Sequence, residues 1–172
     1  MARMTQPTTP AETSPTSADL LHLARAVELS REHMLAGHGG PFGAVIVLGG
    51  QVVGEGWNQV TTTHDPTAHA EVVAIRTACQ GLNRFSLTGA TIYSSCEPCP
   101  MCLAAIYWAR IGRLVYANSR LDAARIGFDD ALLYEEIPLP PSERQLKSTH
   151  LPSADATAVF DLWAAHDAKV HY

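Results

Sequence analysis

The sequence predicts one α/β domain, and three observations support that fold class. The chain has 172 residues, of which 47% are hydrophobic, so it can bury a substantial core of its own. Helical periodicity alternates with short β-type runs through the middle of the chain, as is typical of parallel βαβ crossovers. A Gly-Gly pair between two apolar runs predicts a β-hairpin. No internal repeat divides the chain, so a single domain is expected over residues 17–172.

The first residues predict a tail followed by a helix. Residues 1–16 are rich in Thr, Pro and Ser and show no apolar periodicity, so we expect a disordered N-terminal tail. Thr16 and Asp19 form a capping-box pattern, which marks the start of a helix. Apolar side chains then repeat at helical spacing up to Gly37, which predicts an amphipathic first helix.

The segment GAVIVLGGQVVGEGW predicts two strands joined by Gly49 and Gly50, which supply the positive φ of a tight turn. Helices are then predicted at 69–80 and 99–110, and strands at 90–94 and 113–117. Both helices are apolar nearly all round, so they should pack against a sheet. Beyond residue 118 the pattern predicts a helix near 129–136, a proline-rich break, a possible strand near 146–151 and a final helix near 153–169.

Composition limits the partners and the compartment. Lys and Arg total 12 against 17 acidic residues, a net charge of -5, and no basic cluster forms the footprint that nucleic-acid binding requires. No run approaches the roughly 18 to 20 apolar residues of a membrane span, and the first residues lack the apolar core of a signal peptide. We therefore expect a cytoplasmic protein whose four cysteines are reduced, so close cysteine spacing indicates a metal site or catalysis before a disulfide.

Three of the four cysteines lie in the stretch SSCEPCPMC, residues 94–102. Cys99 and Cys102 are three residues apart, which places both on one face at the start of a helix. A helix N-terminus favours thiolates, and Pro100 suits its first turn. A catalytic zinc needs three protein ligands and an open position, and His69, at the start of the preceding helix, can supply the third ligand.

Glu71 follows His69 by two residues and can lie beside the open position of such a metal. Zinc lowers the pKa of its water toward roughly 7, and a neighbouring carboxylate can accept the proton and pass it on. This arrangement suits hydrolytic attack on a trigonal carbon. The alternative is a closed structural site in which Cys96 joins Cys99, Cys102 and His69, but Glu71 has no use there.

The residues HAE (69–71) and PCPMC (98–102) match the zinc-deaminase signature H-x-E then P-C-x-x-C. Over residues 20–172, through GGPFGAVIV, DPTAHAEVVAIRTAC and GFDD, the chain resembles bacterial guanine deaminases of the cytidine deaminase-like fold. The resemblance implies a three-layer α/β/α architecture, with a mixed central sheet of about five strands and helices on both faces. It also implies a homodimer in which a C-terminal segment, about 153–172, swaps onto the partner.

The same resemblance implies zinc on His69, Cys99 and Cys102, with Glu71 as the proton shuttle. It further implies a set of residues around the base: Asn58, the backbone of Ala70, Phe42, Trp108, Asp130 and the terminal Tyr172. Other interpretations remain for these residues, since Asn58 suits a turn, Phe42 and Trp108 suit a core, and Asp129 and Asp130 could both cap a helix.

The implied reaction is deamination of guanine to xanthine and ammonia, in purine salvage or catabolism. A carboxylate such as Asp130 can accept the adjacent N1–H and 2-amino donors of guanine with both oxygens. Guanosine, cytosine and ammeline are alternatives within the same chemistry. A tRNA adenosine deaminase uses the same motif but predicts a basic surface, and a non-catalytic zinc-binding protein is the alternative outside enzymes.

Overall fold

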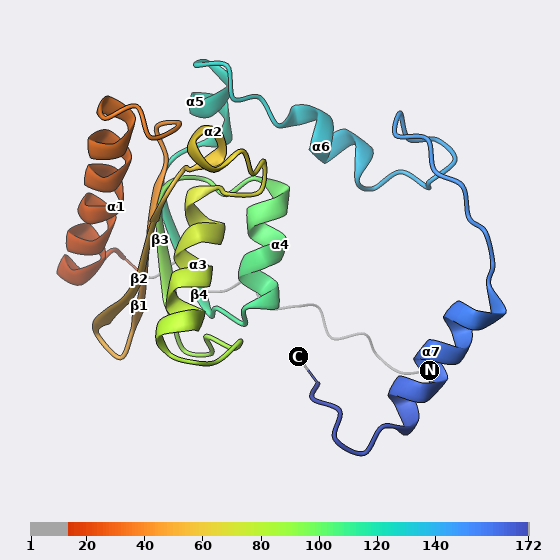
Figure 1. Cartoon of the computed structure of the whole chain (residues 1–172). Coiled ribbons are helices and arrows are strands. Elements are labelled where there is room, and N and C mark those ends of the chain that lie inside the picture. The colour runs from red at the N-terminus through yellow and green to blue at the C-terminus, as the bar shows by residue number, and fades with distance from the viewer. Residues whose placement is uncertain (1–13, 172) are drawn as a thin grey trace, which may run out of the picture.

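A computed structural model describes residues 14–171, so most of the predicted tail, residues 1–16, lies outside the described residues. The elements in chain order are α1 (Ser17–Leu35), β1 (Gly43–Leu48), β2 (Gln51–Trp57), α2 (Val60–Thr63), α3 (Ala70–Gly81), β3 (Thr91–Cys96), α4 (Pro100–Trp108), β4 (Arg113–Asn118), α5 (Arg120–Ala124), α6 (Ala131–Glu136) and α7 (Ala154–Ala165) (Figure 1). Among these residues, no helix combines the length and the apolar character that crossing a membrane requires.

The strands form a mixed sheet in the order β2-β1-β3-β4. β1 pairs antiparallel with both β2 and β3, whereas β3 and β4 are parallel and joined by α4. Helix α1 covers one face of the sheet, and α3 and α4 cover the other (Figure 1). The predicted α/β class, the hairpin and the βαβ crossover are confirmed, and the helices lie on both faces.

The prediction of about five strands is wrong for the residues that the structure describes, because the sheet has four. The segment near 146–151, predicted as a possible strand, has no regular secondary structure and pairs with no strand of the described chain. A strand requires a neighbour for its backbone groups, and every residue from 145 to 168 is exposed. The sheet therefore ends at β4, whose outer edge is open.

Small residues bring α3 close to the sheet. A Cβ at Gly54 would lie 2.5 Å from the carbonyl oxygen of Ala74, and one at Gly56 would lie 2.4 Å from that of Ala70. Ala70, Ala74 and Ala78, spaced four apart along α3, are fully buried. The absence of larger side chains lets the helix backbone contact β2 directly, and this contact fixes the position of the first turn of α3.

The start of α1 is anchored as its capping-box pattern predicts. The Asp19 backbone N–H donates to Oγ1 of Thr16 at 3.1 Å, and a carboxylate oxygen of Asp19 accepts from the Thr16 N–H at 2.9 Å. The same carboxylate accepts from Tyr93 of β3 at 2.8 Å and from Arg113 of β4 at 3.0 Å. The guanidinium of Arg113 holds the pKa of Asp19 far below its ordinary value, so this carboxylate joins α1 to two strands.

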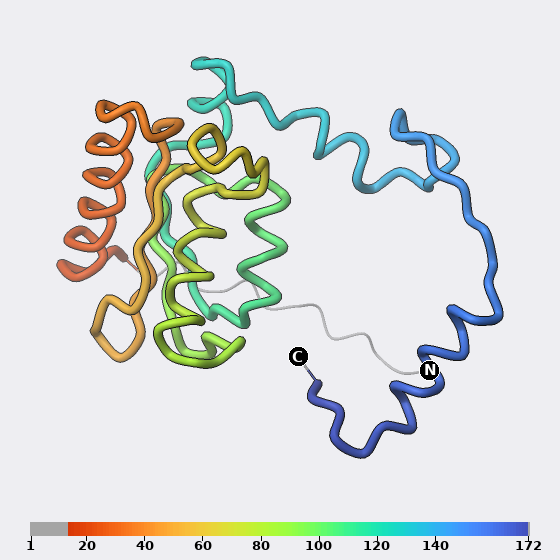
Figure 2. The backbone as a smooth tube through the Cα atoms, in the orientation of Figure 1, coloured from red at the N-terminus to blue at the C-terminus, as the bar shows by residue number. Residues whose placement is uncertain are grey.

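The chain beyond α5 leads away from the sheet, and α7 lies apart from the α/β body (Figures 1 and 2). The predicted final helix is confirmed as Ala154–Ala165. Its large apolar side chains are exposed to solvent, Phe160 by 77% and Leu162 by 70%. We call residues 145–171 the C-terminal arm.

Candidate active site

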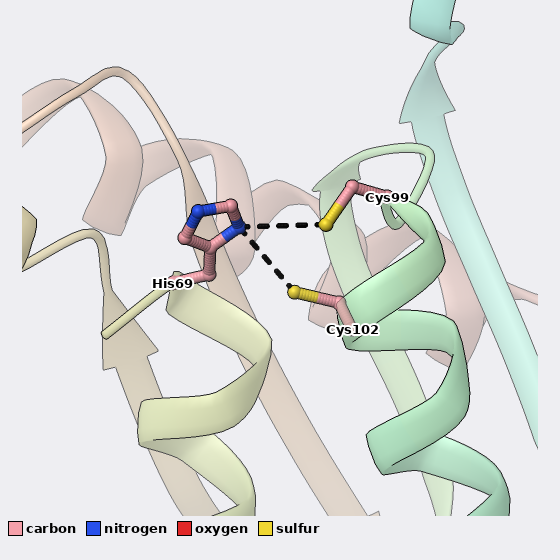
Figure 3. Close-up of side chains that lie close together, drawn as sticks. All are labelled: His69, Cys99 and Cys102. Carbon is pink, nitrogen blue, oxygen red and sulfur yellow. Dashed lines mark hydrogen bonds between the residues drawn. The ribbon is translucent and has the colours of Figure 1, made fainter. Parts of the chain in front are cut away.

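His69, Cys99 and Cys102 point toward one another at the adjacent first turns of α3 and α4 (Figure 3). The Nδ1 atom of His69 lies 3.6 Å from Sγ of Cys99 and 3.5 Å from Sγ of Cys102. His69 is the N-cap of α3 and Cys99 the N-cap of α4. The predicted trio therefore comes together at two helix N-termini, whose positive ends favour thiolates.

These distances fit a tetrahedral zinc. Zn–S bonds of ~2.3 Å and Zn–N bonds of ~2.0–2.1 Å at the tetrahedral angle separate the nitrogen and sulfur ligands by roughly 3.6 Å. All three ligand atoms lie within 4.8 Å of one another, and no other group of this kind occurs among residues 14–171. Histidine with two cysteines is a ligand set of catalytic zinc sites, so the donors present suit this metal.

The two thiols differ in acidity within the chain itself. Hydrogen bonds from Cys102 and from His69 lower the pKa of Cys99 to about 4, although burial opposes this. The contact with Cys99, followed by burial, raises the pKa of Cys102. One thiolate is therefore available at neutral pH, and the second proton leaves when a cation binds.

Cys96 does not belong to this group. Its thiol is buried and donates to the backbone carbonyl of Ser119 at 3.6 Å. Burial raises its pKa to about 11, which keeps the thiol neutral. The geometry therefore disfavours the closed Cys3His alternative.

We expect Cys96→Ser to retain one zinc per chain, because the three ligand side chains are unchanged. Metal analysis of the purified variant by mass spectrometry measures this. Cys99→Ser is the matched control and is expected to lose the metal. Loss of zinc from Cys96→Ser at the same protein yield would instead support a four-ligand site.

Glu71 is 6% exposed and lies in the first turn of α3. Burial raises the pKa of its carboxyl group. Its Oε1 accepts a hydrogen bond of 3.3 Å from the hydroxyl of Ser94 on β3. A buried carboxyl group with a raised pKa next to metal ligands is suited to carrying protons near neutral pH.

A cavity of about 360 Å³ opens beside the three ligands, within the size range of small-molecule sites. Its walls include His69, Glu71 and Cys99, together with the predicted residues Phe42 and Asp130. Burial, and then the thiolate of Cys99, raise the pKa of Asp130. The Asp130 carboxyl group makes no side-chain cap to α6, whereas Oδ1 of Asp129 accepts from the Ala131 N–H at 2.9 Å.

Other predicted residues lie elsewhere. In the part of the chain that the structure describes, Asn58, Ala70 and Trp108 do not line this cavity. Trp108 is 63% exposed and ends α4. It lies six positions after Cys102, about 9 Å along the helix axis. The expectation that Trp108 lines the pocket is therefore not met within one chain. Tyr172 lies outside the described residues.

Asn58 nevertheless holds the cavity wall in place. It is 6% exposed, and its Oδ1 accepts from the backbone N–H groups of Gly40 and Val60, both at 3.3 Å. Its own N–H donates to the carbonyl of Phe42 at 3.0 Å. Asn58 thus fixes the loop that carries Phe42.

Several wall residues were not predicted as residues of a catalytic site: Cys96, Glu97, Arg120, Ala123, Gly127, Phe128, Asp129 and Leu133. Phe128 lies edge-on to Phe42, with the ring centroids 4.9 Å apart. The GFDD motif contains Phe128 and could have indicated it. Arg120 and Ala123 lie on α5, a helix too short for periodicity to reveal.

Residues 16–118 match the family model for the cytidine and deoxycytidylate deaminase zinc-binding region. The guanine deaminase of Bacillus subtilis is 49% identical over 150 residues, which cover 87% of this chain and 96% of that protein. A crystal structure of guanine deaminase from Bacillus subtilis superimposes with a TM-score of 0.87 at 48% identity, over 89% of this chain and 98% of the other. The tRNA-specific adenosine deaminase of Agrobacterium fabrum is 50% identical over 76 residues, 44% of this chain and 50% of that protein.

Proposed function

The chain belongs to the family of cytidine and deoxycytidylate deaminases that carry a zinc-binding region, and from this we propose that it deaminates guanine to xanthine and ammonia. One observation supports the proposal above all. Among the four carboxyl groups that line one cavity, Glu71 lies beside the His-Cys-Cys trio, and Asp130 lies in the wall without capping α6. The near full-length similarity to a guanine deaminase supports the same substrate.

His69, Cys99 and Cys102 are the residues that would hold zinc, which when bound would lower the pKa of its water from about 15.7 to roughly 7. The Glu71 carboxylate accepts the proton of the water that adds to C2 of guanine, and it delivers that proton to ring N3. It next assists transfer of a proton to the 2-amino nitrogen, which departs as ammonia while the C2 carbonyl forms. A cytoplasmic location suits these ligands, because thiolates require reduced cysteines and all four cysteines are free.

The other residues bind and orient the base. The Asp130 carboxylate accepts from N1–H and the 2-amino group, and these donors favour its charged form against the effect of burial. Phe42 offers a face for stacking. Within the described chain, Asn58 and Ala70 do not line this cavity, so we assign Asn58 to holding the Phe42 loop through its Oδ1 and assign Ala70 no contact with the base.

Ammonia release from a panel of bases tests the substrate. We assay zinc-loaded protein with guanine, guanosine, adenine, cytosine and ammeline. Turnover of guanine well above the others supports the proposal, whereas turnover of another base without guanine contradicts it. Deamination of a tRNA stem-loop would indicate the tRNA adenosine deaminases, although the net charge of -5 disfavours that polyanion.

We also propose that the active form is a homodimer in which each C-terminal arm docks on the other chain. The arm is bare, and the sheet edge at β4 is open. A groove runs along α1 beside Ala117 of β4. Its lining is mostly apolar, with Leu20, Leu21, Leu23, Ala24 and Val27, and it also includes the charged residues Arg25, Glu28 and Arg31. An amphipathic helix in a groove is a common way to bury such surfaces. Docking of the arm in this groove would bury the apolar side chains of α7 that a single chain leaves exposed.

Complementation between two defective chains tests the exchange of arms. A variant ending at residue 153 has an intact metal site without α7, and the full-length Glu71→Gln variant has an intact arm without the proton carrier. We expect each to be nearly inactive alone and their co-refolded mixture to recover deaminase activity, since a mixed dimer contains one complete site. An inactive mixture that forms mixed dimers by native mass spectrometry would contradict the exchange.

A further inference from the structure

We propose that Ser94 is a positioning residue for Glu71, a role that rests on the proposed function. Its hydroxyl fixes Oε1 of the carboxyl group toward β3 and thereby directs the other oxygen, Oε2, to the substrate. Ser94 is 2% exposed, and its hydroxyl donates to Glu71 Oε1 at 3.3 Å. Nothing else in the proposed mechanism uses this side chain.

The alternation of side chains along β3 places Ser94 on the face of the sheet where the candidate site lies. Successive side chains of a strand point to opposite faces, so Ile92, Ser94 and Cys96 share one face of β3. Ile92 packs in the core with Ala70 and Ala74 of α3, whereas Tyr93 packs with Ala26 and Leu29 of α1. The α3 face is the one on which Glu71 lies, and Ser94 is held in the sheet between Ala44 of β1 and Tyr116 of β4.

A fixed hydroxyl is a suitable anchor for a carboxyl group that gains and loses a proton. A serine hydroxyl can donate to an oxygen or accept from one, so the contact persists in both states of Glu71. The Glu71 carboxyl group also has hydrogen bonds with its own backbone N–H and with the Cys102 thiol. The Ser94 hydroxyl adds a contact from the sheet that limits rotation about the last torsion, which is broad for glutamate. Locking that torsion reduces the reorganisation needed in the transition state, which affects kcat more than substrate binding.

Ser95 is a matched control on the opposite face of the same strand. It is 4% exposed, and its Oγ accepts from the Gly43 N–H at 3.0 Å. Alanine at either position removes one buried hydroxyl group from β3. A general weakening of the strand would therefore affect both variants alike.

The test compares Ser94→Ala, Ser94→Thr and Ser95→Ala as zinc-loaded full-length proteins, with wild type assayed first on guanine. We expect Ser94→Ala to lower kcat about 10- to 100-fold, with KM within about threefold and the zinc content unchanged. Ser94→Thr keeps the hydroxyl and is expected to recover most of the lost turnover, and Ser95→Ala is expected to keep kcat within about threefold. In the Glu71→Gln background, Ser94→Ala should have little further effect, because residues acting as a unit are not additive.

Three results overturn the proposal: unchanged kcat in Ser94→Ala, an equal fall of kcat in Ser95→Ala, or a full additional fall in the Glu71→Gln background. Failure of the proposed function looks different. In that case the wild-type chain deaminates another base rather than guanine, and the same comparison of variants is made on that base. The relation of Ser94 to Glu71 is then judged apart from the choice of substrate.

Discussion

Replacement of Glu71 by glutamine is expected to lower kcat on guanine by about 10³- to 10⁴-fold, near the upper end of what general acid–base catalysis contributes. Glutamine keeps the size of the side chain but cannot accept and return a proton. The His69, Cys99 and Cys102 ligands are untouched, so zinc content should equal that of wild type. Steady-state ammonia release and metal analysis of the same preparation measure both quantities.

Glu97→Gln is the control for this experiment. Glu97 lines the same cavity, but its Oε2 accepts from the backbone N–H of Arg120 at 3.0 Å, and a glutamine oxygen can still accept that bond. We expect kcat within about tenfold of wild type. If Glu71→Gln retained a similar rate, Glu71 would have to be removed from the mechanism.

Replacement of Asp130 by alanine is expected to lower kcat/KM for guanine by about 10³- to 10⁴-fold, because the site loses a polar contact that recognises this base. The acceptor of N1–H and the 2-amino group is gone, and these donors are left unpaired in the cavity. A base without this adjacent donor pair, such as cytosine, should lose far less. The ratio of kcat/KM for the two bases, measured in wild type and variant, gives the specificity change.

Asp129→Ala is the neighbouring control, because Asp129 lines the same cavity but its carboxylate is engaged by the Ala131 N–H at the start of α6. It should weaken that helix end while the preference for guanine persists. An equal fall of kcat/KM for both bases in Asp130→Ala would show that Asp130 supports the fold and does not recognise guanine.

The elements predicted from the sequence are those that local patterns specify. Positive φ at Gly49 and Gly50 fixes the hairpin, and the capping pattern at Thr16 fixes the start of α1. The fifth strand fails because pairing depends on a neighbour that a local pattern does not reveal, and 146–151 has none within the described chain. The short helices α2 and α5 hold 4 and 5 residues, too few for helical periodicity to be read.

The candidate site shows the same division. The metal trio is predictable because each ligand lies next to a helix start that its own motif marks. The rest of the cavity wall comes from residues that are distant in sequence. Phe128 and Phe42, for example, are 86 positions apart, and only the fold brings their rings together. Trp108 shares a helix with two ligands, yet the rise along α4 carries it out of the cavity, and sequence proximity alone could not indicate that.

The exposed C-terminal arm and the unpaired outer edge of β4 have a thermodynamic consequence. A lone chain leaves Phe160, Leu162 and Trp163 in water, so in the proposed dimer part of the free energy of folding would be released only on association. Mass action then governs stability as well as activity, and the melting temperature should rise with protein concentration. Under this proposal, dilution would separate the chains and lower the specific activity before any chain unfolds.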